Sequence, residues 1–132
     1  MLEVQIFTLY PDLYPGLLDV GIYKKAKEQQ KWSLKIVNIR DYAFDNNRTV
    51  DDTPFGGGSG MLLKPDVVAS ALDKNIKSKE KIIYLSPKGK RLDQKKVKLL
   101  SKLKKINILC GHFEGVDQRL LETRNIEEYS IG

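Results

Sequence analysis

The chain has 132 residues, of which 41% are hydrophobic and 30% are charged, so it is large and apolar enough to fold as one domain. No apolar run approaches the roughly 18 residues of a membrane span, and the first residues lack the basic and apolar segments of a signal peptide. A single cysteine excludes an internal disulfide and fits a reducing cytoplasm. One cysteine and one histidine together argue against a zinc site.

The net charge of +6 is concentrated in one segment. Between Lys74 and Lys105 there are 13 basic and 2 acidic residues, a local balance of +11, and the remaining residues carry −5. A basic segment of this kind attracts polyanions such as RNA. The alternative is a solvated, lysine-rich helix face in an organism that favours lysine codons.

The first elements follow from hydrophobic periodicity. Alternation that ends in an apolar run predicts a buried strand over residues 2–9, and residues 33–39 alternate again as a second strand. Between them we expect a helix from about Leu13 to Gln30, with Asp12 as its N-cap and Gly21 as a weak point. Its imperfect apolar face consists of Leu17, Leu18, Val20, Ile22 and Ala26.

Residues 43–60 have no periodicity and end in a glycine cluster, Gly56 to Gly60. Loops of this length inside a compact domain are usually functional or disordered. We favour an active-site lid or substrate-binding loop over a flexible linker, because the segment begins with charges and amides and contains Pro54-Phe55.

The second half of the chain alternates between helix and strand patterns. The expected elements are a helix from Pro65, a strand over 81–85, a helix capped by Asp93, a strand over 106–110, a helix over about 116–124 and the start of a fifth strand near Glu128. This order predicts an α/β fold, with a mostly parallel sheet flanked by helices and right-handed crossovers.

Two turns at strand ends carry the best site candidates, Ser86 to Gly89 and Gly111 to Gly115, and Ile131-Gly132 would form a third. If these strands are parallel neighbours, all three turns open on the edge where α/β proteins bind ligands. Main-chain groups converging there suit a nucleotide-like ligand. Glu114 is either a helix-opening charge or a site residue.

Other chemistry is disfavoured. We expect Cys110 to be a buried small hydrophobe instead of a nucleophile. No dinucleotide fingerprint follows a strand, and no phosphate-binding lysine loop is present.

Several motifs in matching order carry a resemblance to a known family. They are Arg48-Thr-Val-Asp51-Asp52, Pro54-Phe-Gly-Gly-Gly-x-Gly60-Met61, Ile83-Tyr-Leu-Ser86-Pro87-x-Gly89, Leu92-Asp-Gln94, Cys110-Gly-x-Phe113-Glu114-Gly115-x-Asp117 and Ser130-Ile-Gly132. Together they resemble the bacterial tRNA (guanine-N1)-methyltransferases, the TrmD family of the SPOUT superfamily.

The resemblance implies a homodimeric cytoplasmic enzyme that transfers a methyl group from S-adenosylmethionine to N1 of the guanosine 3′-adjacent to the anticodon in tRNA. The cofactor would lie in a trefoil knot, contacted by Tyr84, Leu85, Ser86, Pro87, Gly111, Phe113, Glu114, Gly115, Ile131 and Gly132. A substrate loop with Arg48, Asp51, Asp52, Gly57 and Gly58 would border the cofactor and the target base. Glu114 would support catalysis, where family members engage Mg²⁺.

The chain departs from the family pattern at two places. His112 and Phe113 replace an arginine and a tyrosine, which keeps an aromatic wall but removes a hydroxyl. The family continues after Ile-Gly with a segment that completes the knot, then the aspartate assigned as general base and a tRNA-binding domain. We therefore expect residues 1–132 to be the N-terminal part of the methyltransferase domain, with the knot incomplete.

On this interpretation the 132 residues alone bind cofactor weakly and lack methyl transfer activity. Two alternatives remain open. One is a non-catalytic RNA-binding module that uses the segment from Lys74 to Lys105, and the other is a SPOUT methyltransferase that acts on ribosomal RNA.

Overall fold

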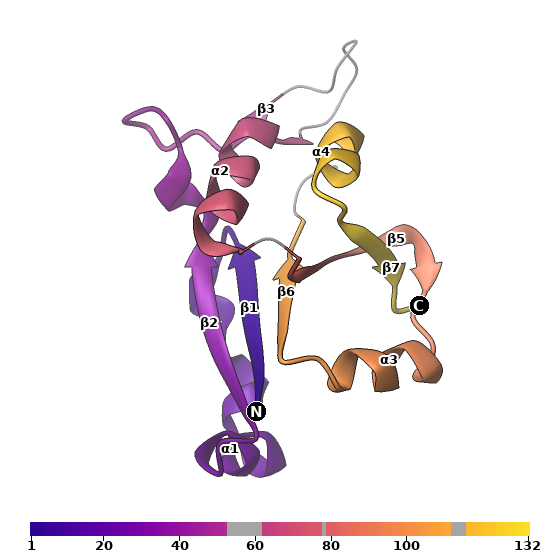
Figure 1. Ribbon diagram of the computed structural model, residues 1–132. Coiled ribbons are helices and arrows are strands. Elements are labelled where there is room, and N and C mark those ends of the chain that lie inside the picture. The colour runs from indigo at the N-terminus through magenta and orange to yellow at the C-terminus, as the bar shows by residue number, and fades with distance from the viewer. Residues whose placement is uncertain (53–61, 78, 112–115) are drawn as a thin grey trace.

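Five parallel strands form the central sheet of the computed structural model, which describes residues 1–52, 62–77, 79–111 and 116–132. The strand order is β2-β1-β6-β5-β7 (Figure 1). The strands are β1 (Leu2–Thr8), β2 (Trp32–Asn38), β5 (Lys81–Arg91), β6 (Lys105–Leu109) and β7 (Glu127–Ser130). The predicted α/β fold with a parallel sheet and flanking helices is confirmed, and the knot stays a prediction.

Strand β1 lies inside the sheet, as its apolar run predicts. It pairs with β2 from Leu2↔Trp32 to Thr8↔Asn38 and with β6 from Glu3↔Lys105 to Phe7↔Leu109. Because both of its edges are hydrogen-bonded and its second half is covered on both faces, residues 5–8 are all buried.

Two hydrophobic layers cover the two faces of the sheet. Helices α2 (Pro65–Asn75) and α4 (Gln118–Thr123) supply Leu72 and Leu121 to the larger layer. Helix α3 (Gln94–Ser101) supplies Leu100 to the smaller one. Successive side chains of β5 alternate between them, with Ile82 and Tyr84 in the first and Ile83 in the second.

The expected helix from Leu13 to Gln30 is wrong. The segment forms two 3-10 helices, η1 (Pro11–Leu13) and η2 (Gly16–Asp19), and the short helix α1 (Gly21–Glu28). Gly16 and Gly21 have φ of +54° and +58°, the left-handed region, which interrupts a right-handed helix. Asp12 lies inside η1 and is not an N-cap.

The apolar face expected on that helix is not buried either. Leu17 is 83% exposed and Ile22 is 75% exposed, and none of η1, η2 and α1 contains a buried residue. Helix α1 lies at the β2 edge of the sheet, opposite the edge formed by β7 (Figure 1).

The other helix starts agree with the sequence. Pro65 occupies the first turn of α2, where its missing N–H costs nothing. The carboxylate of Asp93 accepts a hydrogen bond from the Lys96 amide at 2.8 Å and caps α3. Within the described ranges, no helix is long and apolar enough to cross a membrane.

Three short elements flank the undescribed residues 53–61. The 3-10 helix η3 (Ile39–Tyr42) follows β2, and β3 (Asp51–Asp52) pairs antiparallel with β4 (Leu62–Leu63). The residues on either side of 53–61 are therefore paired beside α2 (Figure 1), and the predicted loop over 43–60 contains strand β3.

Candidate functional site

The carboxyl ends of β6, β5 and β7 meet at one edge of the sheet, because these three strands are parallel neighbours. The parallel arrangement on which the three-turn prediction depends is therefore confirmed, whereas the meeting of the turns themselves stays a prediction, since residues 112–115 lie outside the described residues. Residues 86–89 differ in detail from the expected turn. They interrupt the pairing of β5 with β7, so that Leu85 and Lys90 are both aligned with Tyr129.

The ring of Tyr84 in β5 packs against the backbone at Gly111, just after the end of β6. A Cβ atom on Gly111 would lie 2.5 Å from Cε1 and 2.7 Å from the hydroxyl oxygen of Tyr84. Only a glycine leaves room for the tyrosine ring at this position. Burial, and secondarily the charge of Glu128, raises the pKa of Tyr84, which keeps the phenol neutral.

Ser86 and Glu128 join the turn after Leu85 to β7. The Ser86 hydroxyl donates a hydrogen bond to the Glu128 carboxylate, and its oxygen accepts one from the Lys88 amide at 3.2 Å. Glu128 was not among the residues predicted for the site. Its position two residues before Ser130-Ile131 is the only sequence signal that could have pointed to it.

Gly89 allows β7 to pass close to the same turn. A Cβ atom there would lie 2.5 Å from the backbone nitrogen of Tyr129. Backbone atoms cannot move aside as a flexible side chain can, so the glycine is required for this approach.

Glu127 anchors the start of β7 to its neighbours. It accepts hydrogen bonds from Lys81 at 2.5 Å and from the Tyr129 hydroxyl at 2.7 Å, and Lys96 lies 3.5 Å away. Burial opposes ionisation of this carboxyl, but the lysines and Tyr129 outweigh burial and lower the pKa of Glu127. This cluster was also missed by sequence reasoning.

Cys110 lies at the start of the second turn and is half-buried. Its sulfur is 3.4 Å from the hydroxyl oxygen of Tyr14, which comes from the loop between η1 and η2. The hydrogen bond to Cys110, followed by burial, raises the pKa of Tyr14 to about 12. Burial raises the pKa of the thiol, so the environment does not activate Cys110 as a nucleophile.

Three predicted cofactor contacts present apolar surface near these turns. Leu85 is 39% exposed, Ile131 is 77% exposed, and Pro87 is also exposed, as is Gly132 at the end of the chain. Sites for small ligands are lined mostly by apolar groups, so these side chains fit the predicted role in ligand binding.

The predicted substrate loop is only partly described. Arg48 forms a 3.0 Å ion pair with Asp41. Asp51 and Asp52 form β3 through their backbones. Leu63, in the partner strand β4, also pairs with Val116, so the base of the loop lies beside the far end of the second turn.

The remaining predicted site residues, Gly57, Gly58, Phe113, Glu114 and Gly115, lie outside the described residues. Within the described part of the chain, no group of three His, Cys, Asp or Glu side chains could hold a metal ion.

A cavity of about 780 Å³ lies between α2, α4 and the starts of β5 and β7. Its lining includes Glu128 but none of the predicted cofactor contacts, and it mixes acidic with basic side chains. The convergence of turns at the other end of the strands therefore remains the better candidate site.

Comparison with known proteins identifies the family of the chain. The family model described as tRNA (Guanine-1)-methyltransferase TrmD matches residues 2–132. A tRNA (guanine-N(1)-)-methyltransferase of Pelagibacter ubique (strain HTCC1062) is 64% identical over all of this chain and 58% of its own length. A protein of the same name from Brucella canis is 49% identical over 98% of this chain and 53% of its own length.

A third relative of that name, from Wolbachia pipientis subsp. Culex pipiens, is 45% identical over 98% of this chain and 57% of its own length. The chain thus spans somewhat more than half the length of the curated relatives it matches. Since the family model covers the chain from residue 2 to its last residue, the chain belongs to the tRNA (guanine-1)-methyltransferase TrmD family.

Proposed function

We propose that residues 1–132 are the N-terminal, cofactor-binding part of an enzyme that methylates N1 of the guanosine 3′-adjacent to the anticodon in tRNA. The observation that supports the proposal is the parallel arrangement of the neighbouring strands β6, β5 and β7, which carry the three predicted turns, in a chain of this family. The names of the relatives support the reaction and the substrate class.

S-adenosylmethionine, when bound, supplies an electrophilic methyl group. On this proposal Leu85, Pro87 and Ile131 provide apolar walls for it, and the backbone at Gly111 approaches it closely. Tyr84 does not need to ionise for this role, since its packing against Gly111 shapes the second turn. Ser86 and Glu128 hold the first and third walls at a fixed separation.

The methylated nitrogen must lose its proton as it attacks the methyl group, so a positioned base has to accept that proton. We assign the role of this base to none of the described residues beside the turns. We place Glu114 at the site as a supporting carboxylate that could engage Mg²⁺, and the loop with Arg48, Asp51, Asp52, Gly57 and Gly58 beside the target base. The pairing of Leu63 with Val116 supports that position of the loop.

We further propose that the enzyme is a cytoplasmic homodimer. Five large apolar side chains in residues 13–23 are each more than half exposed, namely Leu13, Leu17, Val20, Ile22 and Tyr23. An exposed apolar patch of this kind is typical of an interaction surface. Sedimentation of the protein from the complete reading frame tests the dimer, and L17D/I22D should shift it toward monomer if this patch is the interface.

The reaction is tested with the protein from the complete reading frame, S-adenosylmethionine and tRNA transcripts. Methyl transfer should require a guanosine 3′ to the anticodon and should disappear when adenosine replaces it. Transfer to ribosomal RNA fragments instead would favour the ribosomal alternative. Salt-sensitive tRNA binding without cofactor binding by calorimetry would favour the RNA-binding module.

A further inference from the structure

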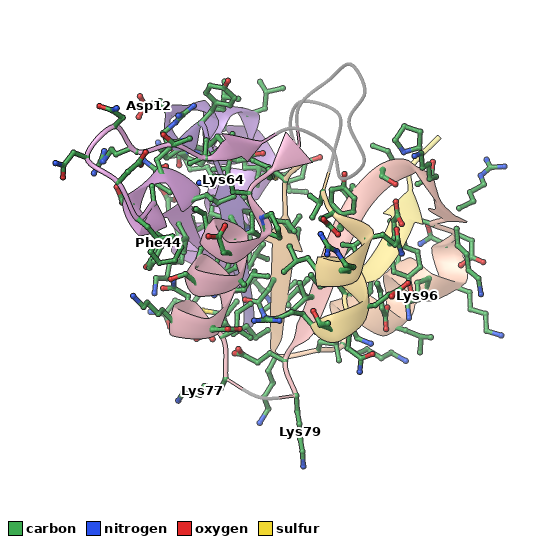
Figure 2. All side chains as sticks on the ribbon, turned by 90° about the horizontal axis from the view of Figure 1, so that it is seen from above. Asp12, Phe44, Lys64, Lys77, Lys79 and Lys96 are labelled. Carbon is green, nitrogen blue, oxygen red and sulfur yellow. The ribbon has the colours of Figure 1, made fainter. Side chains whose placement is uncertain are left out.

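The basic residues of the central segment are not distributed evenly over the surface. Between Lys88 and Lys104 there are eight basic residues and one acidic residue, Asp93, which is used to cap α3. Lys96 is the one member of this group with an acidic neighbour in the described structure, Glu127 at 3.5 Å. Lys96 lies beside β7 in Figure 2, whereas Lys77 and Lys79 project at another edge of the molecule.

Six of the others form what we name the α3 basic surface, defined as Lys88, Lys90, Arg91, Lys95, Lys98 and Lys102. All six are exposed, and none of them forms an ion pair with any acidic side chain that the structure describes. Their charge is therefore available to a partner in solution.

Helical spacing aligns three of these lysines. Lys95, Lys98 and Lys102 follow one another at intervals of three and four residues, which places them on one side of α3 and just beyond its end. Leu100 is buried in the layer between α3 and the sheet, so the helix packs on the sheet through this side chain. The lysines are thus presented by a packed element and not by a free tail.

The α3 basic surface begins at the proposed cofactor site. Lys88 lies in the same turn as Ser86, and Lys90 and Arg91 follow at the end of β5, directly before α3. The end of β5 and helix α3 lie together on the β7 side of the sheet (Figure 1). A polyanion that follows this surface is led toward the turn that would hold the methyl donor.

General enrichment in lysine does not account for this arrangement. Outside residues 74–105 the chain carries a net charge of −5, so its other basic residues are outnumbered by acidic ones. An RNA phosphate backbone is bound by clustered cations, and Asp93 is the single acidic residue between Lys88 and Lys104.

We propose that the α3 basic surface binds the phosphate backbone of the substrate RNA and directs it toward the turn at Ser86. This inference rests on the proposed function, because it assigns a position to the RNA substrate of that reaction. Lys95, Lys98 and Lys102 provide sequence-independent electrostatic contacts, and they touch neither the cofactor nor the reacting base.

The test compares two charge reversals of equal size in the protein from the complete reading frame. K95E/K98E/K102E alters the α3 basic surface, and K74E/K77E/K79E alters three exposed lysines at and just beyond the end of α2, of which Lys77 and Lys79 project at another edge of the molecule (Figure 2). Binding of a tRNA transcript is measured by fluorescence anisotropy from 50 to 300 mM KCl. Calorimetry with S-adenosylmethionine, in the absence of RNA, reports separately on folding and the cofactor site.

We expect the α3 reversal to weaken tRNA binding at least about tenfold at the lowest salt, and to reduce the slope of log affinity against log salt by about 1 to 3. Cofactor affinity should not change. The neutral variant K95Q/K98Q/K102Q should also lose tRNA affinity, but by a smaller factor. This comparison separates a lost attraction from an introduced repulsion.

Equal tRNA affinity for K95E/K98E/K102E and the wild type would overturn the inference. Equal losses of tRNA affinity in this variant and in the control reversal would also overturn it. A failure of the proposed function looks different, because the wild-type protein would then not methylate tRNA at all. If the glutamate variant does not fold, the glutamine variant decides between these outcomes.

Discussion

The hydroxyl of Ser86 donates a hydrogen bond to the carboxylate of Glu128, so the turn that interrupts β5 is attached to the neighbouring strand β7. These two residues are 42 positions apart in the chain. The bond fixes the distance between two of the three walls around the proposed cofactor site, and cofactor affinity should therefore depend on it.

Removing either partner should weaken cofactor binding, and Ser86 should matter somewhat more because its oxygen also accepts a hydrogen bond from the Lys88 amide. Ser86→Ala and Glu128→Ala are each expected to weaken S-adenosylmethionine binding about fivefold, since a hydrogen bond to a charged group contributes on the order of 1 kcal/mol when it is partly exposed. The double variant should lose little more than Ser86→Ala alone, because the hydrogen bond between the two side chains is already lost in either single variant. Isothermal titration calorimetry measures all three affinities.

Ser101→Ala is the matched control, because that hydroxyl bonds to a carbonyl within α3, away from the turn. Its affinity should equal that of the wild type. Losses in the Ser86 and Glu128 variants that add fully in the double variant would show that the two side chains act independently.

The contact of Gly111 with Tyr84 leads to a second prediction. Gly111→Ala places a methyl group 2.5 Å from the Tyr84 ring, so the ring must leave its buried position. Overpacking of this kind is expected to lower the free energy of unfolding by about 1–3 kcal/mol. Urea denaturation followed by circular dichroism measures the loss.

Gly132→Ala serves as the control, since a Cβ atom there meets nothing within 4 Å. The alanine at position 111 should cost much less in a Tyr84→Ala background, where the obstructing ring is absent. An unchanged cost in that background would mean that Tyr84 is not what excludes a side chain at this position.

Much of the fold could be predicted from the sequence because local signals and tertiary packing agree there. Asp93 and Pro65 mark helix starts by their own chemistry, and the apolar run in β1 requires a central strand. The helix expected over 13–30 shows the opposite case. Its hydrophobic spacing resembled a buried face, but left-handed backbone at Gly16 and Gly21 divides the segment and leaves the apolar side chains exposed.

The candidate site also contains some residues that could be predicted from the sequence and others that could not. Glycines at strand ends can be recognised because close backbone approach requires them, as Gly111 against Tyr84 illustrates. Glu127 and Glu128 were missed, since two adjacent glutamates near a strand start carry no local pattern beyond their closeness to Ser130-Ile131. Their roles arise from contacts with Lys81 and Ser86, more than 40 residues away, which only the strand order brings together.

The ion pairs of Glu127 predict a pH dependence of stability. Because the folded state lowers the pKa of this carboxyl, its contribution is complete above the pKa of the unfolded chain, about 4.3, and is lost as pH falls through the lower folded value. Glu127→Gln should therefore destabilise the protein by about 1 kcal/mol at pH 7, with this difference shrinking below about pH 4. Urea denaturation at pH 7, 5, 4 and 3.5 measures it.

Glu28→Gln, at an exposed carboxyl on α1, should leave stability within about 0.5 kcal/mol of wild type across this range. A destabilisation by Glu127→Gln that stays constant down to pH 3.5 would show that the ionised carboxylate of Glu127 does not stabilise the fold.

The last prediction concerns Cys110, whose thiol is the single one in the chain and can therefore be followed without ambiguity. Burial raises its pKa, so little thiolate exists at neutral pH and alkylation by iodoacetamide should be slow. The rate should keep rising above pH 9 in the folded protein, whereas in 8 M urea it should level off near the ordinary pKa of about 8.5.

Tyr14→Phe refines this measurement. The Tyr14 hydroxyl stabilises the thiolate and so partly offsets the effect of burial. Its removal should raise the apparent pKa of Cys110 further and slow alkylation at pH 8.5, and Tyr23→Phe, at an exposed ring on α1, should not. Faster alkylation in Tyr14→Phe would mean that the tyrosine acts mainly by covering the sulfur of Cys110, and that its hydrogen bond has little influence on the pKa of the thiol.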